Sequence, residues 1–304
     1  MLALVSFLAL AACLSAAAPT GFDSNRAYDH LRTIVGIGPR PAGSAALDAT
    51  RKYIREQLAA AGVKLVADQA WNASTPAAWA GKPQVRMINL IATIPGARSE
   101  RIVFCGHYDT KVFHDFTFVG ANDGGSSAAF LIELARVLQG RKNPFTMEIV
   151  FLDGEEAFHP TAWAGLDHTY GSRHYVEVAQ QTGTIKSLKA FVLVDMIGAR
   201  NLVLDRETNS TPWLMDAMWQ AARKLGYEEN LGQVSAIEDD HLPFLEAGVE
   251  AVDLIDLNNY TPWHTAEDTL DKVSARSLQI VGDIILAALP GIEARLAKPA
   301  ASKR

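Results

Sequence analysis

The chain has 304 residues, a length that suits one large α/β domain or two smaller domains. Apolar residues make up 49% and charged residues 20%, proportions that exclude a disordered or collagen-like chain. The net charge is −6, and no run of Lys and Arg supplies the positive footprint that nucleic-acid binding requires. We therefore expect no nucleic-acid partner.

The first nineteen residues carry no charged side chain and end in an Ala/Ser-rich stretch, which predicts an export leader over residues 1–18. Leu10-Ala11-Ala12-Cys13 resembles the box in which bacterial lipoproteins are lipidated on cysteine, whereas Ala16-Ala17-Ala18 offers an ordinary cleavage site. We expect an exported protein, periplasmic or secreted, whose membrane attachment would come only from a lipidated Cys13. No other run is long and apolar enough to be expected to span a bilayer.

The remaining chain contains no repeat or low-complexity linker, so we expect one domain over residues 24–295 and a frayed tail over 296–304. Two helices should come first, Ser24–Ile37 and Ser44–Ala61, each beginning at a serine that can cap free N–H groups. Six stretches are typical of strands: Val63–Val66, Val85–Ile94, Ile102–Cys105, Met147–Leu152, Ala190–Val194 and Ala251–Leu254. Four more helices are expected at Ser126–Leu138, Tyr170–Gln180, Pro212–Leu225 and Ser274–Leu289.

Alternating strands and helices predict an α/β fold with a mixed, mostly parallel, doubly wound central sheet flanked by helices. In such a sheet the functional site lies at the carboxyl ends of the strands. Cys105 is the only cysteine after the leader, so no internal disulfide is expected in the mature domain. Because Cys105 lies inside a predicted strand, we interpret it as a buried, unreactive thiol.

Acids and histidines follow several of these predicted strands. The predicted strand Ile102–Cys105 is followed by His107-Tyr108-Asp109, and Met147–Leu152 is followed by Asp153-Gly154-Glu155-Glu156. The strand Ala190–Val194 is followed by Asp195. Asp123 lies in a glycine-bearing turn before a helix, and His264 lies in a loop before the last helix. Any one of these residues alone is more often a helix cap or a solvated group. Together they predict a zinc site, because carboxylate and imidazole are the usual non-sulfur ligands of zinc.

Two other kinds of site, a serine nucleophile and a phosphate-binding loop, find less support in the sequence. Ser126-Ser127 is not set in a Gly-x-Ser-x-Gly elbow, so a serine nucleophile is not indicated. The glycines at 120, 124 and 125 do not form a phosphate-binding fingerprint. Metal-assisted chemistry is therefore the favoured interpretation.

Several motifs together resemble the zinc aminopeptidase superfamily of the M28 type: His107-Tyr108-Asp109, Asn122-Asp123-Gly124, Asp153-Gly154-Glu155-Glu156, Asp195 and His264-Thr265. Within it, further stretches resemble the animal glutaminyl-peptide cyclotransferases, or glutaminyl cyclases: Asp153–Phe158, Tyr170–His174, Asp195–Ala199, Glu238–Leu245 and Trp263–Thr265. The resemblance is collinear from about residue 26 to residue 290 and implies a zinc aminopeptidase-like catalytic domain.

This resemblance implies cyclisation of the N-terminal glutamine of peptides or proteins to pyroglutamate, with release of ammonia. It also implies one Zn²⁺ per chain, with Asp123, Glu156 and His264 as the ligands. Glu155 would be the general acid/base, with Asp195 and Asp239 hydrogen-bonded around it. Trp163 and Trp263 would wall the substrate pocket, and His107 would be available for a second metal.

Two alternatives remain open from the sequence. One is a dinuclear M28 aminopeptidase, in which His107 and Asp195 would help to hold a second zinc. The other is a catalytically inactive binding module on the same fold, which is disfavoured because every expected ligand is present. Two positions depart from the animal cyclases, which carry Gln in place of Glu238 and His in place of Asp253; both are expected to border the pocket and to affect substrate preference.

Overall fold

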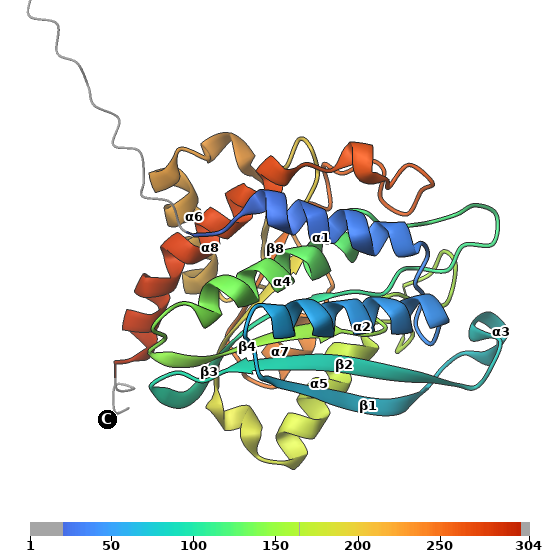
Figure 1. Cartoon of the computed structure of the whole chain (residues 1–304), viewed down its shortest axis with the longest axis horizontal. Helices are drawn as coiled ribbons and strands as arrows, with labels where there is room; N and C mark the ends of the chain where they lie inside the picture. Colours follow the sequence, from blue (N-terminus) through green and yellow to red (C-terminus); the bar gives the residue numbers. More distant parts are fainter. Residues whose placement is uncertain (1–20, 164, 299–304) are drawn as a thin grey trace, which may run out of the picture.

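A computed structural model describes residues 21–163 and 165–298. The export leader, the Cys13 lipidation site and the end of the expected tail therefore lie outside the described residues. Within these limits the chain forms a three-layer α/β arrangement in which helices cover both faces of a central sheet (Figure 1). The predicted fold class is confirmed.

The central sheet has six strands in the order β1-β2-β4-β3-β5-β8. Strands β3, β4, β5 and β8 are parallel to one another, while β1 and β2 form an antiparallel edge. The strand bounds are β1 Leu65–Ser74, β2 Gln84–Ile94, β3 Arg98–His107, β4 Phe145–Leu152, β5 Leu188–Asp195 and β8 Ala251–Ile255. Because the parallel strands are covered on both faces, they are nearly continuous apolar runs, which explains why the sequence located them.

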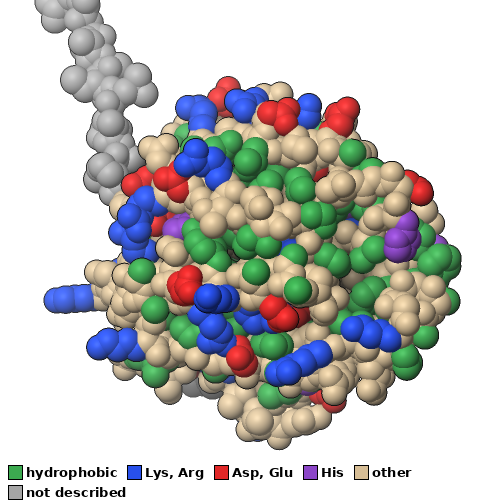
Figure 2. Space-filling view, turned by 45° about the vertical axis from the view of Figure 1, so that its right-hand side comes forward, with side chains coloured by type: hydrophobic (Ala, Val, Ile, Leu, Met, Phe, Trp, Pro, Cys, Tyr) green, Lys and Arg blue, Asp and Glu red, His purple; other side chains and the backbone are tan. Residues whose placement is uncertain are grey.

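One face of the sheet carries the larger core, which is built with the helices α1 Ser24–Ile37, α2 Ala45–Ala60, α4 Gly125–Gln139, α6 Pro212–Leu225 and α8 Ala275–Leu296. The other face packs against α5 Tyr170–Gln181 and the short α7 Leu242–Glu246. Cys105 lies in this second core as a buried free thiol, as predicted. On the face in Figure 2, basic and acidic side chains intermingle over the surface.

Several boundaries differ from the sequence-based expectation. The N-cap of α1 is Asp23, whose carboxylate accepts from the N–H groups of Asn25 and Arg26, and not Ser24. Strand β1 continues to Ser74, eight residues past the predicted end at Val66. As an edge strand it is mostly exposed and polar, so no buried apolar run marked its full length in the sequence. Helix α8 continues to Leu296, past the expected end at Leu289.

Helix α8 also corrects the expectation about membrane spans. Its 22 residues are long and apolar enough to cross a bilayer by length and composition. Most of that apolar stretch is buried, however, and it packs against α1, α4 and α6 within the core. Its hydropathy is therefore that of a core helix.

Besides three 3-10 helical turns, two short strands and two short α-helices in the described part of the chain were not predicted from the sequence. Strands β6 Leu204–Glu207 and β7 Leu231–Ser235 form a separate two-stranded parallel sheet, and the others are α3 Ala77–Ala80 and the helix α7. Strand β7 is largely exposed, so it carries no buried pattern that would predict it. Strand β7 matters for the site described below, because it is followed directly by the segment Ala236–Asp239, which lines the cavity.

Candidate active site

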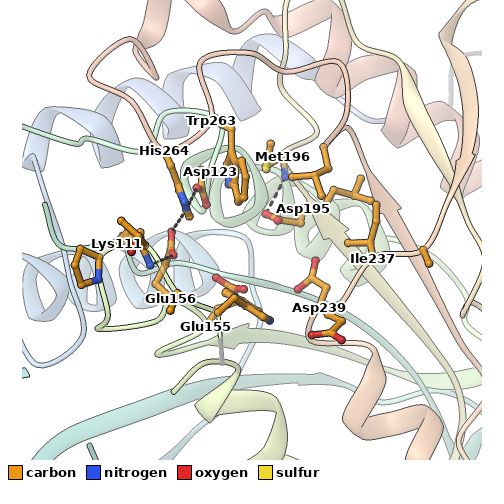
Figure 3. A pocket seen from close by; sticks show the side chains of 18 residues that line it. Lys111, Asp123, Glu155, Glu156, Asp195, Met196, Ile237, Asp239, Trp263 and His264 are labelled. Carbon is orange, nitrogen blue, oxygen red and sulfur yellow. Dashed lines mark hydrogen bonds and ion pairs between the residues drawn. The ribbon is translucent and has the colours of Figure 1, made fainter. Parts of the chain in front are cut away.

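The candidate active site is a cavity of about 290 Å³ at the carboxyl edge of the parallel strands (Figure 3). Strand β3 ends at His107 and β5 at Asp195, while the turn after β4 carries Glu155 and Glu156. Parallel strands bring their carboxyl ends to one edge, so residues far apart in sequence meet there. Every residue that the sequence assigned as a candidate metal ligand, acid/base or pocket wall, other than His107, lines this cavity: Asp123, Glu155, Glu156, Trp163, Asp195, Asp239, Trp263 and His264.

The three predicted metal ligands lie together. Nε2 of His264 is 3.2 Å from Oε1 of Glu156 and 3.3 Å from Oδ2 of Asp123, and one donor atom from each residue lies within 4.8 Å of the other two. Burial disfavours the imidazolium, but the adjacent carboxylates of Glu156 and Asp123 outweigh it and raise the pKa of His264 to about 10. A cation bound between Glu156 and Asp123 would supply the positive charge that protonated His264 supplies here.

A second group of donors shares Asp123. Nε2 of His107 is 3.1 Å from Oδ1 of Asp123 and 3.2 Å from Oδ1 of Asp195, and these three residues also meet the spacing of a metal site. His107 is buried and does not line the cavity. Oδ1 of Asp195 is also an acceptor for the backbone N–H of Met196 at 2.8 Å and for the hydroxyl of Ser127 at 3.4 Å.

The carboxyl of Glu155 is buried beside these groups and points into the cavity (Figure 3). Burial raises its pKa well above the ordinary range, and the nearby charge of Glu156 raises it further, against the opposing effect of His107. Burial and the charge of Asp195 likewise raise the pKa of Asp239. The site therefore holds a group of acids that cannot all be ionised together.

Glu155 and Glu156 owe their placement to Asp109, which the sequence showed only as part of a motif. The two carboxylate oxygens of Asp109 accept from the backbone N–H of Glu155 at 3.2 Å and of Glu156 at 3.3 Å. The turn is thereby fixed so that one side chain faces Asp123 and His264 while its neighbour faces the open cavity.

Arg40 performs a similar role for the turn that carries Asp123. Its buried guanidinium donates to the carbonyl oxygens of Tyr108 at 2.9 Å, Val119 at 2.6 Å and Gly120 at 2.9 Å, with a longer contact to that of Asp123 at 3.4 Å. Burial lowers the pKa of Arg40 to about 10, which leaves it charged at neutral pH. Sequence reasoning missed Arg40, because nothing local distinguishes it from a solvated arginine.

Two further residues were also missed. Lys111 lines the cavity, donates to the carbonyl oxygen of Ala157 at 2.9 Å and lies 3.7 Å from Oε2 of Glu156. Asp268 accepts from the backbone N–H groups of Asn122 and Asp123. Lys111 comes four residues after His107, just past the end of a strand, and this position was the only feature of the sequence that could have indicated its place in the cavity.

Both predicted wall tryptophans line the cavity. Trp263 is 42% exposed, so it is not a core residue, and it stacks on His264. Trp163 stacks on His168 with ring centroids 4.3 Å apart. Of the two departures from the animal cyclases, Glu238 lines the cavity as expected. Asp253 does not: it is fully buried on β8 next to β5, with its Oδ2 3.8 Å from Nδ1 of His241.

Residues 89–289 match peptidase family M28, and the chain belongs to that family. Among proteins of known function, similar sequences include glutaminyl-peptide cyclotransferases. Glutaminyl-peptide cyclotransferase from Boiga irregularis is 30% identical over 81% of this chain and 75% of that enzyme. The Bos taurus enzyme of the same name is 31% identical over 65% of this chain, which spans 64% of the bovine enzyme.

Solved structures agree with this placement. The glutaminyl cyclase of an Acidobacteriales bacterium is 38% identical, with a TM-score of 0.84 over 95% of this chain and all of that one. The Porphyromonas gingivalis glutaminyl cyclase is 27% identical, with a TM-score of 0.79 over 89% of this chain and 98% of that one. Within family M28, the chain is thus a homologue of the glutaminyl-peptide cyclotransferases.

Proposed function

We propose that this protein is a glutaminyl-peptide cyclotransferase that converts the N-terminal glutamine of peptides or proteins to pyroglutamate and releases ammonia. The observation that carries the proposal is the position of Glu155, a buried carboxyl of raised pKa that shares one cavity with Asp123, Glu156 and His264. The similarity to glutaminyl cyclases over nearly the whole chain supports the same function.

The donor set fits Zn²⁺, and we propose one zinc per chain held by Asp123, Glu156 and His264. Oδ2 of Asp123 and Oε2 of Glu156 are buried and accept no hydrogen bond from the described residues. Each has only a looser contact with a basic side chain, His264 at 3.3 Å and Lys111 at 3.7 Å, so a bound cation would satisfy them better. Two carboxylates and one imidazole are ordinary zinc ligands and leave a coordination position open. The chemistry that zinc supplies when bound is polarisation of a carbonyl oxygen as a Lewis acid.

The proton transfers fall to Glu155. As the α-amino nitrogen of the substrate bonds to its own γ-carbon, the Glu155 carboxylate accepts a proton from that nitrogen. It then donates a proton to the amide nitrogen, which leaves as ammonia when the bond from the γ-carbon to that nitrogen breaks. Burial raises the pKa of Glu155, so its carboxyl holds a proton more readily than an ordinary glutamate does, and this suits the donation to the leaving amide nitrogen.

The neighbouring residues position Glu155 and the substrate. In our proposal Asp195 and Asp239 share protons with Glu155, and the raised pKa of Asp239 supports this arrangement. Trp163 and Trp263 hold the glutamine side chain in the folded conformer that brings amine and γ-carbon together, which reduces the entropic cost of cyclisation.

The second candidate function is that of a dinuclear M28 aminopeptidase, and the trio of His107, Asp123 and Asp195 is the observation that favours it. In that case Glu155 would activate a water for peptide hydrolysis. Turnover of a glutaminyl-peptide amide and a leucyl-peptide amide by the purified protein separates the two functions. We expect ammonia and a pyroglutamyl product from the first and no free leucine from the second; the reverse pattern would identify a peptidase.

We also propose that the protein is exported, because residues 1–18 are apolar and carry no charged side chain. Cell fractionation of the full-length chain and of a Cys13→Ala variant tests this. Release of the variant from a membrane fraction would indicate lipidation, and equal amounts of both in the soluble exported fraction would indicate ordinary cleavage.

A further inference from the structure

The mouth of the cavity is formed by its exposed lining residues. Of all the residues that line the cavity, four have exposed side chains: Thr161, Ala236, Glu238 and Trp263. The candidate metal ligands and Glu155 lie inside and are buried or half-buried. A substrate whose glutamine side chain reaches those groups must lead the rest of its peptide out past these four residues.

Glu238 is the one charged residue among the four. No hydrogen bond or ion pair of its carboxylate is found within residues 21–163 and 165–298. The nearby His168 does not neutralise it, because burial and the charge of Arg173 lower the pKa of that imidazole. The cavity lysine, Lys111, is turned inward to Ala157 and Glu156. The Glu238 carboxylate is therefore free to meet a substrate.

The cavity as a whole is acidic, like Glu238. Its walls carry six carboxyl groups, against the two cationic side chains of Lys111 and His264. A divalent cation between Asp123, Glu156 and His264 would offset the charge of the inner acids, but Glu238 lies at the mouth and outside that trio. An acid at the entrance of a cleft raises the local concentration of cationic ligands and repels anionic ones.

We propose that Glu238 is a specificity-determining residue, which makes the enzyme favour glutaminyl peptides that carry Lys or Arg directly after the glutamine over those that carry Asp or Glu. This inference rests on the proposed cyclotransferase function. The second residue does not react, so the preference acts through binding and appears mainly in KM.

The test compares three peptides with the purified full-length protein loaded with zinc: Gln-Lys-Ala-amide, Gln-Ala-Ala-amide and Gln-Glu-Ala-amide. One exposed charge pair changes binding by up to about fivefold, so attraction and repulsion together predict a Lys-to-Glu ratio in kcat/KM of roughly five to twenty. Screening shortens to about 3 Å at 1 M salt, so the ratio should fall toward one as salt is raised.

Glu238→Gln should bring the Lys-to-Glu ratio in kcat/KM to within about twofold of one, because the charge that separates the two peptides is removed. Glu246→Gln, the same change at an exposed acid outside the cavity, is the matched control and should keep the wild-type ratio. A wild-type ratio near one, or the same ratio in wild type and Glu238→Gln, overturns the inference alone. Failure of the wild type to release ammonia from the neutral peptide overturns the proposed function and this inference with it.

Discussion

The indole of Trp263 lies against the imidazole of His264, with ring centroids 4.2 Å apart and planes inclined by 23° (Figure 3). His264 has a φ of 54°, in the left-handed region that non-glycine residues rarely adopt. Such strain persists only where the surroundings hold the backbone in place. Trp263 thus contributes both a wall of the cavity and part of the support for a candidate metal ligand.

Trp263→Ala should therefore reduce activity much more than it reduces stability. We expect kcat/KM to fall at least about tenfold, while the Tm falls by only a few degrees because the side chain is 42% exposed. Trp219→Ala is the matched control: that tryptophan is buried in the core on α6, and its loss should cost about 3–5 kcal/mol of stability. Normal turnover by Trp263→Ala with a collapsed Tm would make its role structural.

Glu155 and Glu156 are adjacent but should respond differently to the same substitution. Glu155→Gln should keep zinc and lose about 10²–10⁴-fold in kcat, because a positioned acid/base contributes that much. Glu156→Gln should also weaken zinc binding, since Glu156 belongs to the trio with Asp123 and His264. Zinc content after dialysis and turnover, measured on both variants, give the answer. Equal zinc retention with equal loss of activity would contradict these assignments.

The parts of this site whose meeting follows from strand positions alone are those at the ends of buried strands. The apolar runs of β3, β4 and β5 are unambiguous, so His107, Glu155, Glu156 and Asp195 had to emerge at one edge of the sheet. Trp263 and Asp239 lie in loops, and only the family resemblance brought them to the site.

The supports of the site could not be predicted in the same way. Arg40 acts through four carbonyl oxygens, and a backbone acceptor leaves no trace in the sequence. The position of Asp253 behind the cavity depends on its pairing next to Leu193 in β5, since each strand position alternates between faces. The segment at Glu238 depends on β7, whose exposed residues carry no periodic signal.

Arg40→Lys tests whether the carbonyl contacts hold the Asp123 turn in place. Lysine keeps the charge but cannot reach the three nearest carbonyl oxygens at once, so buried acceptors lose their donors at a cost of about 2–4 kcal/mol. We expect a lower Tm and, in the folded protein, zinc affinity about tenfold weaker by chelator competition. Arg141→Lys is the control, because Arg141 pairs with Glu293 outside the cavity. Unchanged zinc affinity in folded Arg40→Lys would limit its role to stability.

Glu207 gives a prediction about acid stability. Burial disfavours its charge, but the imidazole of His241, whose Nε2 lies 3.2 Å from Oε2 of Glu207, and hydrogen bonds from the N–H of Asn209 and the hydroxyl of Ser210 outweigh this effect and lower the pKa to about 2. It also accepts from the N–H of Ile237, next to Glu238 in the cavity wall. A lowered pKa contributes stability that is complete above the ordinary value of 4.5 and is lost as the pH falls through about 2.

Glu207→Gln should therefore lower the free energy of unfolding at pH 7 by on the order of 1–3 kcal/mol. The gap between wild type and variant should shrink as the pH falls from 5 to 2. Urea unfolding of the zinc-free form of both proteins measures this without a contribution from ligand protonation. A gap that is constant from pH 7 to pH 2 would show that the Glu207 charge contributes nothing.

The last prediction is that the working cyclase holds one zinc, although donors for two are present. Five carboxyls converge in the cavity (Asp123, Glu155, Glu156, Asp195 and Asp239), and one Zn²⁺ cannot neutralise all of them. Either a second metal enters between His107 and Asp195, or the surplus acids share protons. Burial raises the pKa values of Glu155 and Asp239, which favours proton sharing, and Oδ1 of Asp195 is already engaged by the N–H of Met196.

A proton held among Glu155, Asp195 and Asp239 keeps an acid ready to donate to departing ammonia, whereas a dinuclear peptidase needs Asp195 ionised and bound to metal. Elemental analysis of protein purified without chelator, combined with stepwise return of zinc to the apo form, distinguishes the two states. We expect full glutaminyl-amide turnover at one zinc per chain, and we expect His107→Gln to retain that zinc. Cyclase activity that appears only at two zincs would contradict proton sharing, and leucyl-amide hydrolysis at two zincs would favour the peptidase, because only that reaction requires a water bridging two metals.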